Sequence, residues 1–369
     1  MSIASPRASL RRLLWMMAGC MALGIVGLSG CGQRADHSVD ESRPARRIVS
    51  IVEAGRVVLP RVRSVAVMGE HAFACQILDG MTLVNLADPA APRVARRFGP
   101  NEIQPLEIAV DGTLLFIADR FRGLVVWDAA RADGPTSLSA LALPGIATGV
   151  QLKRDGARRL ALVACGSGGL SVVDVSDASR PRLLGSEAKN IDYARSAAGV
   201  GSLTLLADNA DGGLRVIDLA RPEAPVALGA FLMSGFAESV HADDTLVASA
   251  WRTGGTRLHA VAGDAASVLR PPVLLATTYR SRNRCHDARV LTAVPDGAAP
   301  ADRQLMAVAD DLNGVDVYDV ADPALPLLVG EHHTDGAASA LAEYRGHLLV
   351  ACWDAGLVLL RIDDKGARP

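Results

Sequence analysis

The sequence predicts an all-β fold, a seven-bladed β-propeller whose blades are four-stranded antiparallel sheets. Three observations lead to this prediction. A phrase of two apolar strands around a glycine turn occurs seven times. Successive copies are 42 to 46 residues apart, with one interval of 59, and a period in the low forties is typical of a four-stranded blade. Short alternating strands bounded by Gly and Pro recur throughout, whereas helical periodicity is scarce.

The repeat is clearest in GGLSVVDVSDASRPRLLG (Gly168–Gly185), GGLRVIDLARPEAPVALG (Gly212–Gly229) and NGVDVYDVADPALPLLVG (Asn313–Gly330). Glycine supplies the open backbone conformation that a tight turn needs, and proline, which cannot donate to a strand ladder, separates the third strand from the fourth. The apolar faces of one blade need the next blade to cover them. Each copy has one marker glycine: Gly80, Gly123, Gly169, Gly213, Gly255, Gly314 and Gly356.

The innermost strand of a blade is expected just before each copy of the phrase. Six such segments are Leu106–Val110, Gly149–Leu152, Ala194–Ala198, Glu238–Ala242, His286–Val290 and Ser339–Glu343. The 59-residue interval is attributed to a longer loop at Gly263–Arg270 and an insertion at Thr292–Gln304, both rich in small and polar residues.

The seventh copy ends without a fourth strand, which would leave the edge of its third strand unpaired. At the other end of the chain, RRIVSIVEAG resembles the fourth strands of the other blades. We therefore predict that Ile48–Val52 pairs with Gly356–Ile362 and closes the ring, so that the propeller spans residues 46–369. The alternative is that Ile48–Val52 extends the preceding tether and blade seven stays three-stranded.

Residues 1–30 are predicted to be a lipoprotein signal peptide. Three arginines precede an apolar run at Leu13–Ser29 that is too short to argue for a spanning helix. The run ends in LSGC, which resembles a bacterial lipobox and implies lipidation of Cys31. The alternative is an ordinary secretory signal with a chance cysteine. Gly32 follows the cysteine, which resembles outer-membrane lipoproteins, and residues 31–45 are expected to form a disordered polar tether.

The phrase GLRVIDLARPEAP closely resembles the LVIVD repeat, a family named for this strand and found in exported and surface proteins. The resemblance extends over nearly the whole mature chain and is weakest in copy five, where GTRLHAVAGD lacks the aspartate and the Asp-Pro turn. It implies a propeller in an extracytoplasmic setting. It implies no catalytic residues.

Composition narrows the functional classes. Without the three arginines of the signal, 35 basic residues face 40 acidic ones, so a nucleic-acid partner is not expected. Nucleophile-elbow, zincin and phosphate-loop motifs are missing from the sequence, and we predict neither catalytic residues nor a cofactor. Four cysteines remain after processing, with disulfide pairing and metal binding left open: Cys75, Cys165, Cys285 and Cys352.

The innermost strand of each blade, strand a, begins at one mouth of the central channel, and the next strand, strand b, ends there. Two rings of side chains are therefore expected at this mouth. The strand-a ring reads Arg63, Glu107, Gly149, Arg195, Glu238, Asp287 and Ser339, and the strand-b ring reads Cys75, Asp119, Cys165, Asp208, Ser249, Asp310 and Cys352. Mixed charges at a channel mouth are typical of a site for a polar ligand. The alternative is structural: strand-end aspartates accept turn N–H bonds, and Arg and Glu pair with each other.

The hexapeptide RCHDAR (Arg284–Arg289) is the richest in chemistry and adds His286 to the candidate ligand-binding residues. On a strand, Cys285 and Asp287 would share one face and His286 would take the other. Because ligands from other blades would have to converge on them, a metal site is not predicted.

These observations favour a lipid-anchored binding or scaffolding module of the bacterial cell envelope, expected at the outer membrane and monomeric. Its partner would be another envelope protein or a surface polymer, and it would meet the membrane only through its lipid. The alternative is a lactonase-like propeller hydrolase using Glu107, Glu238 and Asp287 around a divalent cation.

Overall fold

The computed structural model describes residues 47–130, 134–210, 213–232, 235–243, 246–260, 273–278, 284–292 and 304–367. The predicted signal peptide, Cys31 and the tether lie outside the described residues, as do Gly263–Arg270 and most of Thr292–Gln304. The described part of the chain contains no helix, and so none that is long and apolar enough to cross a membrane.

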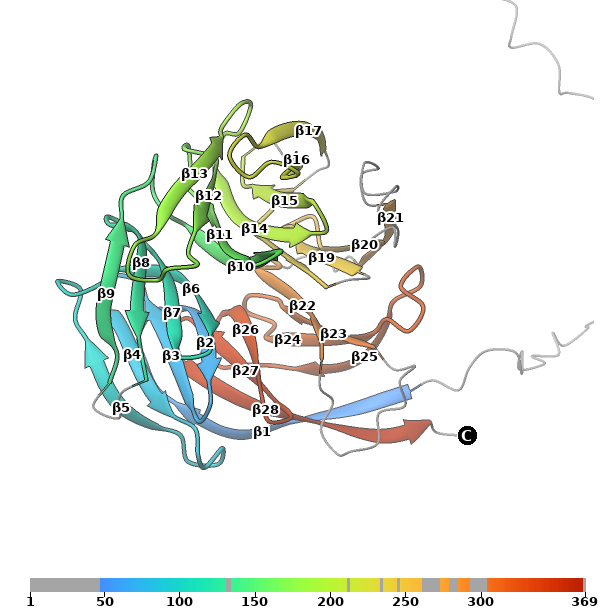
Figure 1. Cartoon of the computed structure of the whole chain (residues 1–369). Coiled ribbons are helices and arrows are strands. Elements are labelled where there is room, and N and C mark those ends of the chain that lie inside the picture. Colours follow the sequence, from blue (N-terminus) through green and yellow to red (C-terminus); the bar gives the residue numbers. More distant parts are fainter. Residues whose placement is uncertain are drawn as a thin grey trace, which may run out of the picture. The chain divides into compact units, whose positions relative to one another are not determined.

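Seven antiparallel sheets of four strands are arranged in a ring (Figure 1). The innermost strands, strands a, are β2 (Val62–Met68), β6 (Pro105–Asp111), β10 (Gly149–Asp155), β14 (Ala194–Val200), β18 (Ser239–Ala242), β22 (Asp287–Leu291) and β26 (Ala338–Tyr344). Strands b are β3 (His71–Gln76), β7 (Leu114–Asp119), β11 (Arg158–Ala164), β15 (Leu203–Asp208), β19 (Leu246–Ala250), β23 (Leu305–Ala309) and β27 (His347–Cys352).

The outer half of each blade consists of strands c and d. Strands c are β4 (Gly80–Asn85), β8 (Gly123–Asp128), β12 (Leu170–Asp174), β16 (Gly213–Asp218), β20 (Thr256–Ala260), β24 (Val315–Asp319) and β28 (Gly356–Ala367). Strands d are β5 (Arg93–Phe98), β9 (Thr136–Leu141), β13 (Arg182–Glu187), β17 (Val226–Phe231), β21 (Val273–Thr278), β25 (Leu327–His332) and, for blade seven, β1 (Arg47–Val57). The predicted seven-bladed propeller is confirmed.

The marker glycine of each repeat lies at the turn between strands b and c. All seven have φ between 70° and 90°, a region that residues with a Cβ rarely adopt. The space beside them is also closed. A Cβ on Gly169 would lie 2.1 Å from the carbonyl oxygen of Glu187, which belongs to strand d of the same blade. A Cβ on Gly80 or Gly123 would lie 2.0 or 2.3 Å from the equivalent carbonyl oxygen. Both the backbone conformation and the strand packing therefore require glycine here.

The aspartate that ends strand c is a turn residue. The Asp174 carboxylate accepts a hydrogen bond from the Ser176 N–H at 3.0 Å, and Asp218 accepts one from the Ala220 N–H at 2.8 Å. This Asx turn directs the chain out of strand c toward the proline-containing connection. The aspartate of the repeat phrase therefore has a structural role.

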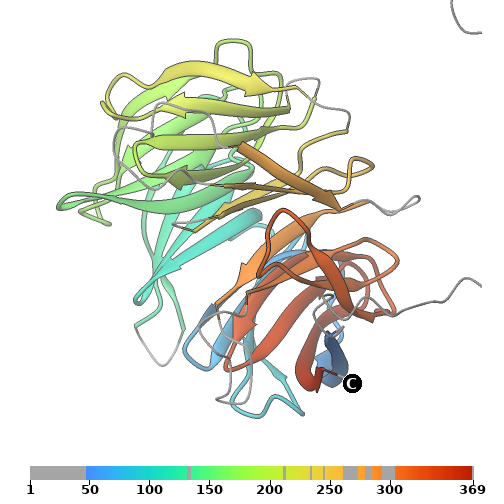
Figure 2. The same ribbon diagram turned by 90° about the vertical axis from the view of Figure 1, so that its right-hand side faces the viewer.

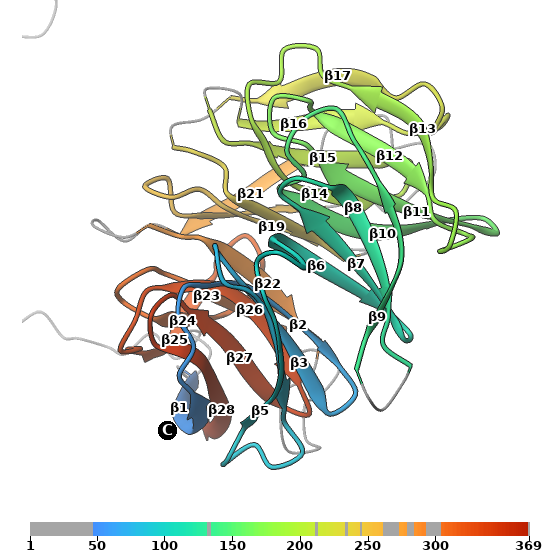
Figure 3. The ribbon, with the colours of Figure 1, turned by 90° about the vertical axis from the view of Figure 1, so that its left-hand side faces the viewer.

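Seven apolar clusters fill the seven interfaces between neighbouring blades. Each cluster joins side chains of two consecutive blades, and the side views in Figures 2 and 3 show the blades stacked face to face around the ring. A small residue lies near the end of each strand b; Ala164, Ala207 and Ala309, for example, have no exposed surface. Small side chains there let the blades approach closely.

The ring closes through the two ends of the propeller, as predicted. β1 pairs antiparallel with β28 from Val57 opposite Leu357 to Arg47 opposite Ala367, which places Ile51 opposite Ile362. Figures 1 and 3 show the two strands side by side. The closing strand is longer than predicted, because pairing extends beyond Ile48–Val52 to Val57.

Gly169→Ala is expected to lower the free energy of unfolding by about 2 kcal/mol or more, because it adds a left-handed-region penalty to a clash with the Glu187 carbonyl. Urea unfolding measures this. Gly229→Ala is the control, since that glycine has no positive φ and open space around a built Cβ, and its effect should stay within about 0.5 kcal/mol. Equal effects of the two substitutions would contradict the assigned role of the marker glycines.

Candidate functional site

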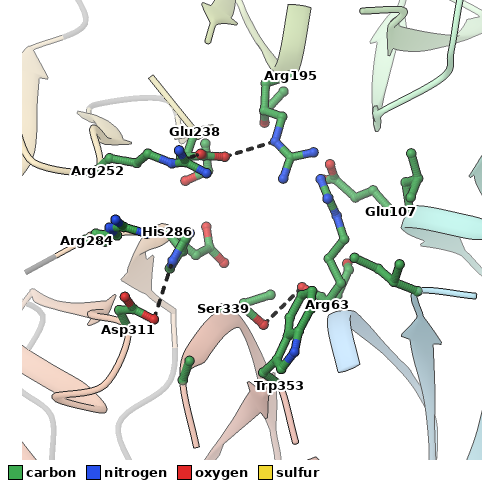
Figure 4. A pocket seen from close by; sticks show the side chains of 18 of the residues that line it. Arg63, Glu107, Arg195, Glu238, Arg252, Arg284, His286, Asp311, Ser339 and Trp353 are labelled. Atoms are coloured by element: carbon green, nitrogen blue, oxygen red, sulfur yellow. Dashed lines mark hydrogen bonds and ion pairs between the residues drawn. The ribbon is translucent and has the colours of Figure 1, made fainter. Parts of the chain in front are cut away.

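A cavity of about 450 Å³ lies at the end of the channel where the strands a begin. Blades one, two and four to seven provide its described lining residues, so chain segments far apart in sequence meet there. Figure 4 shows their side chains around a shared opening. The charged and imidazole side chains are Arg63, Glu107, Arg195, Glu238, His241, Arg252, Arg284, His286, Asp287, Arg289 and Asp311.

The structure brings together six of the nine candidate residues predicted for the channel mouth: Arg63, Glu107, Arg195, Glu238, His286 and Asp287. They do not form a single ring. Glu107 and Asp287 lie opposite Ala118 and Ala309 in the strand a–strand b ladder. Arg63 and Arg195 lie one position earlier, at β-bulges of β2 and β14. The expected strand-a ring therefore combines two successive positions of strand a. Arg63, Arg195, Glu238 and His286 form an outer level, and Glu107 and Asp287 form an inner level.

The other three candidates, Asp119, Asp208 and Asp310, do not line this cavity. Asp119 is buried and accepts hydrogen bonds from the N–H groups of Gln104, Phe121 and Arg122, at 2.8 to 3.0 Å. These bonds tie the turn after strand b to the chain entering strand a.

The two remaining aspartates are equally enclosed. Asp208 accepts a hydrogen bond from the Tyr193 N–H at 2.9 Å and from Arg215 Nε at 3.1 Å. Asp310 is buried beside the thiol of Cys285. The expected strand-b ring is therefore turned into the blades, where its side chains join turns and interfaces instead of facing the channel.

Glu238 is the most enclosed acid of the outer level, with 3% of its side chain exposed. Its carboxylate accepts a hydrogen bond from Arg195 Nε at 2.9 Å and contacts Arg252 Nε with its other oxygen. Burial acts to raise the pKa of Glu238, but Arg195 and Arg252 outweigh it and hold the pKa below its usual range. Glu238 is thus an ionised bridge between two arginines.

Asp287 has the corresponding position at the inner level. One oxygen is 2.7 Å from His241 Nε2, and the other is 3.3 Å from Arg289 Nε and accepts a hydrogen bond from the Leu341 N–H. Burial acts to raise the pKa of Asp287, but His241 and Arg289 outweigh it and hold the pKa well below its usual range. Burial and the charge of Arg289 lower the pKa of His241, against the opposing effect of Asp287.

Glu107 differs from Glu238 and Asp287 in the direction of its pKa shift. Burial inside the channel raises the pKa of Glu107 to about 8; Arg289 opposes this shift and Asp287 adds to it. The carboxylate occupies space left by blade three, since a Cβ on Gly149 would lie 2.8 Å from Glu107 Oε2. At neutral pH this acid is largely protonated, unlike Glu238 and Asp287.

The four cysteines in the described part of the chain are free, buried thiols in four different interface clusters. Burial raises the pKa of Cys165 to about 11 and that of Cys352 to about 12. Cys285 faces the interface between blades five and six, whereas Asp287 lines the cavity. The expected shared face of these two residues is therefore not observed, because β22 begins only at Asp287. No group of three potential metal-binding side chains occurs among the described residues.

Several cavity residues had not been singled out from the sequence. Arg252, Asp311 and Trp353 each directly follow the position that ends strand b in the repeat, and Ile77 is their equivalent in blade one. Aligning the repeats could have identified the residue that follows strand b as a position at the cavity. His241 and Arg289 lie two residues after Ser239 and Asp287 along their strands a. Blades one, two and seven have alanine at this position.

The channel continues beyond this cavity into a second space of about 330 Å³. Of the described residues, four border both spaces: Glu107, Ser196, His241 and Arg289. The second space is otherwise lined largely by small and aliphatic residues such as Ala66 and Ala109. The charged groups are therefore concentrated toward one end of the channel.

Two segments match the family model of the LVIVD repeat, residues 160–188 and 307–334. They run from strand b to strand d of blades three and six. The chain thus contains LVIVD repeats within a seven-bladed propeller, as predicted from the repeat phrase. No curated protein matches the chain.

Solved structures are similar in fold. The WD40 repeats of RRP9 match with 13% identity and a TM-score of 0.64 over 87% of this chain and 99% of that one. U3-55K matches with 13% identity and a TM-score of 0.63, covering 86% and 98%. The computationally designed Ika8 protein matches with 10% identity and a TM-score of 0.55, covering 83% and 98%. At these identities the likeness shows the fold alone.

Glu238→Ala is expected to lower the free energy of unfolding by about 1–3 kcal/mol, because it leaves Arg195 and Arg252 facing each other without their shared acid. Chemical denaturation measures the change. Glu70→Ala serves as the control, since Glu70 pairs with Arg345 on the surface and its loss should cost about 0.5 kcal/mol or less. Unchanged stability of Glu238→Ala would show that the outer-level ion pairs are not structural.

Proposed function

We propose that this propeller is a lipid-anchored binding module of the bacterial cell envelope, attached to the outer membrane through Cys31. Its partner is another envelope protein or a surface polymer, and the mouth end of the propeller is the binding face. The observation that carries the proposal is the concentration of exposed apolar side chains at that end, around the polar cavity.

The strand directions define this face. Strands a begin at the mouth, so the turns between strands b and c and the connections from strand d to the next strand a lie at the same end. Turn residues Leu78, Phe121 and Leu312 are 55%, 72% and 69% exposed, and Trp353 borders the cavity. The connections add further exposed apolar side chains: Val58, Ile146, Tyr193, Leu232 and Phe236.

The opposite end differs in character. Among the described residues, its turns expose a single large apolar side chain, Leu325, and otherwise consist mainly of Gly, Pro, Ala and polar residues. Exposed apolar groups gathered on one face mark interaction surfaces in soluble proteins, and large aromatic side chains such as Phe121 and Trp353 are typical anchors. This asymmetry supports partner binding at the mouth end.

The geometry favours binding over the lactonase-like alternative. A divalent cation needs carboxylates whose charge is available to it. Here Glu238 is shared by Arg195 and Arg252, and Asp287 by His241 and Arg289. Their negative charges are already matched by neighbouring cations, which disfavours cation binding.

Phe121→Ser combined with Leu312→Ser should remove the partner that the wild-type protein captures after cross-linking in native envelopes, because both anchors project from the proposed face. Quantitative mass spectrometry of the captured material measures this. Leu138→Ser combined with Leu183→Ser is the matched control, as these exposed leucines lie on outer strands β9 and β13. Capture that depends on the control pair instead would place the interface at the outer edge of the blades.

Cys31→Ala should leave an unprocessed or soluble protein, because the proposal assigns membrane attachment to the lipid alone. Fractionation of cells, followed by a carbonate wash of the membranes, measures the attachment, with the wild-type protein as control. A processed variant that remains with the washed membranes would contradict lipid anchoring.

A further inference from the structure

The mouth cavity contains more basic than acidic groups, although the chain as a whole is acidic. Its described lining residues include five arginines and four carboxyl groups, while the formal net charge of the chain is −2. Because Glu107 keeps its proton well above the usual range for a carboxyl group, the excess is larger at neutral pH than this count suggests. A positive, partly enclosed cavity attracts anions more strongly than an open surface does.

Two of the arginines are placed to hold a ligand. Figure 4 shows the Arg63 and Arg195 side chains extending into the cavity from blades one and four, with Glu107 of blade two beside them. Arg195 donates its Nε–H group to Glu238. This bond orients the guanidinium plane and leaves its terminal nitrogens toward the cavity (Figure 4). An oriented guanidinium group can bind a planar anion through two parallel hydrogen bonds.

We propose that the channel mouth binds a carboxylate group of the partner, between the guanidinium groups of Arg63 and Arg195. This inference deepens the proposed function and rests on it, because it names the chemical group that the binding face recognises. The carboxylate is that of an Asp or Glu side chain of an envelope protein, because the exposed apolar turns around the mouth, such as Phe121 and Leu312, suit a protein surface.

The charge balance favours a single negative charge over a phosphate dianion. Arg252 and Arg289 already form ion pairs with Glu238 and Asp287, so the surplus of positive charge that is available to a ligand is small. A dianion would also face repulsion from these ionised acids and from Asp311 across the same cavity. A volume of about 450 Å³ is sufficient for a monosaccharide or an amino-acid side chain.

Glu107 links this binding to pH. The charged groups that act on Glu107 are Arg289 and Asp287, and the buried Cys75 thiol also interacts with it. The side chains of Arg63, Arg195 and His241 line the same cavity. A bound carboxylate adds negative charge beside Glu107 and favours its protonated form, so binding takes up a proton when Glu107 starts ionised. Affinity should therefore be highest below the pKa of Glu107 and should fall as pH rises through about 8.

The test uses the full-length protein in detergent and calorimetric titration with sodium galacturonate and, separately, with N-acetyl-glutamate amide. Wild type is expected to bind the glutamate derivative more tightly than galacturonate. The reverse order would assign the carboxylate to a uronic acid of a surface polymer instead. Arg63→Gln and Arg195→Gln should each weaken binding about tenfold or more. Arg97→Gln, which changes an arginine of outer strand β5, should leave binding unchanged.

The pH dependence is a second measurement. Above pH 8, wild-type affinity should fall by up to about tenfold per pH unit, and Glu107→Gln should bind with little change over the same range. If Arg195→Gln does not fold, as judged by circular dichroism, Arg63→Gln and Glu107→Gln carry the test, since neither side chain takes part in the Glu238 bridge.

Three results would overturn the inference: no binding of either probe, binding unaffected by Arg63→Gln, or inorganic phosphate binding as tightly as the carboxylates. The probes are small and need no envelope partner. Loss of carboxylate binding with intact capture by the apolar face would therefore refute this inference alone. Carboxylate binding without any mouth-dependent capture would refute the proposed binding face alone.

Discussion

Each blade needs its neighbours to cover both of its apolar faces, and the pairing of β1 with β28 makes this dependence circular. Val49 of β1 is 4% exposed and belongs to the cluster between blades six and seven. A Cβ on Gly330 of β25 would lie 2.5 Å from Val49 Cγ2, which shows how closely the closing strand packs on blade six. Without β1, strand β28 would present an open edge. Ring closure thus stabilises all seven interfaces.

Closure also creates the candidate site, because it holds the starts of the strands a around one opening. Arg63, Arg195 and Arg289 come from segments more than ninety residues apart, yet they line the same cavity. Like charges gathered in this way would repel one another without the intervening acids. Glu238 and Asp287 supply the compensation, so one network both supports the mouth and sets its charge. The apolar turns around it add a surface suited to a macromolecule.

Much of the fold could be predicted because its determinants are local and repeated. The marker glycines identify turns that tolerate no other residue well. The missing fourth strand of blade seven identified β1 as its replacement. The site was harder to predict. Asp119 and Asp208 carry the same charge as Asp287, yet they accept turn hydrogen bonds inside the blades. The expected strand-a ring also combined two successive positions, because Arg63 and Arg195 lie one ladder position before Glu107 and Asp287.

The sequence by itself determined the number of blades, the strand order within each blade and the partner of the closing strand. These follow from period, turn chemistry and the need to pair an open edge, which act between near neighbours or between equivalent copies. Only the tertiary structure decided which charges meet at the mouth, why Glu107 holds its proton while Glu238 does not, and that the exposed apolar turns share one face. Those outcomes depend on the direction of each side chain and on distances across the closed ring, and such distances exist only once all seven blades have packed.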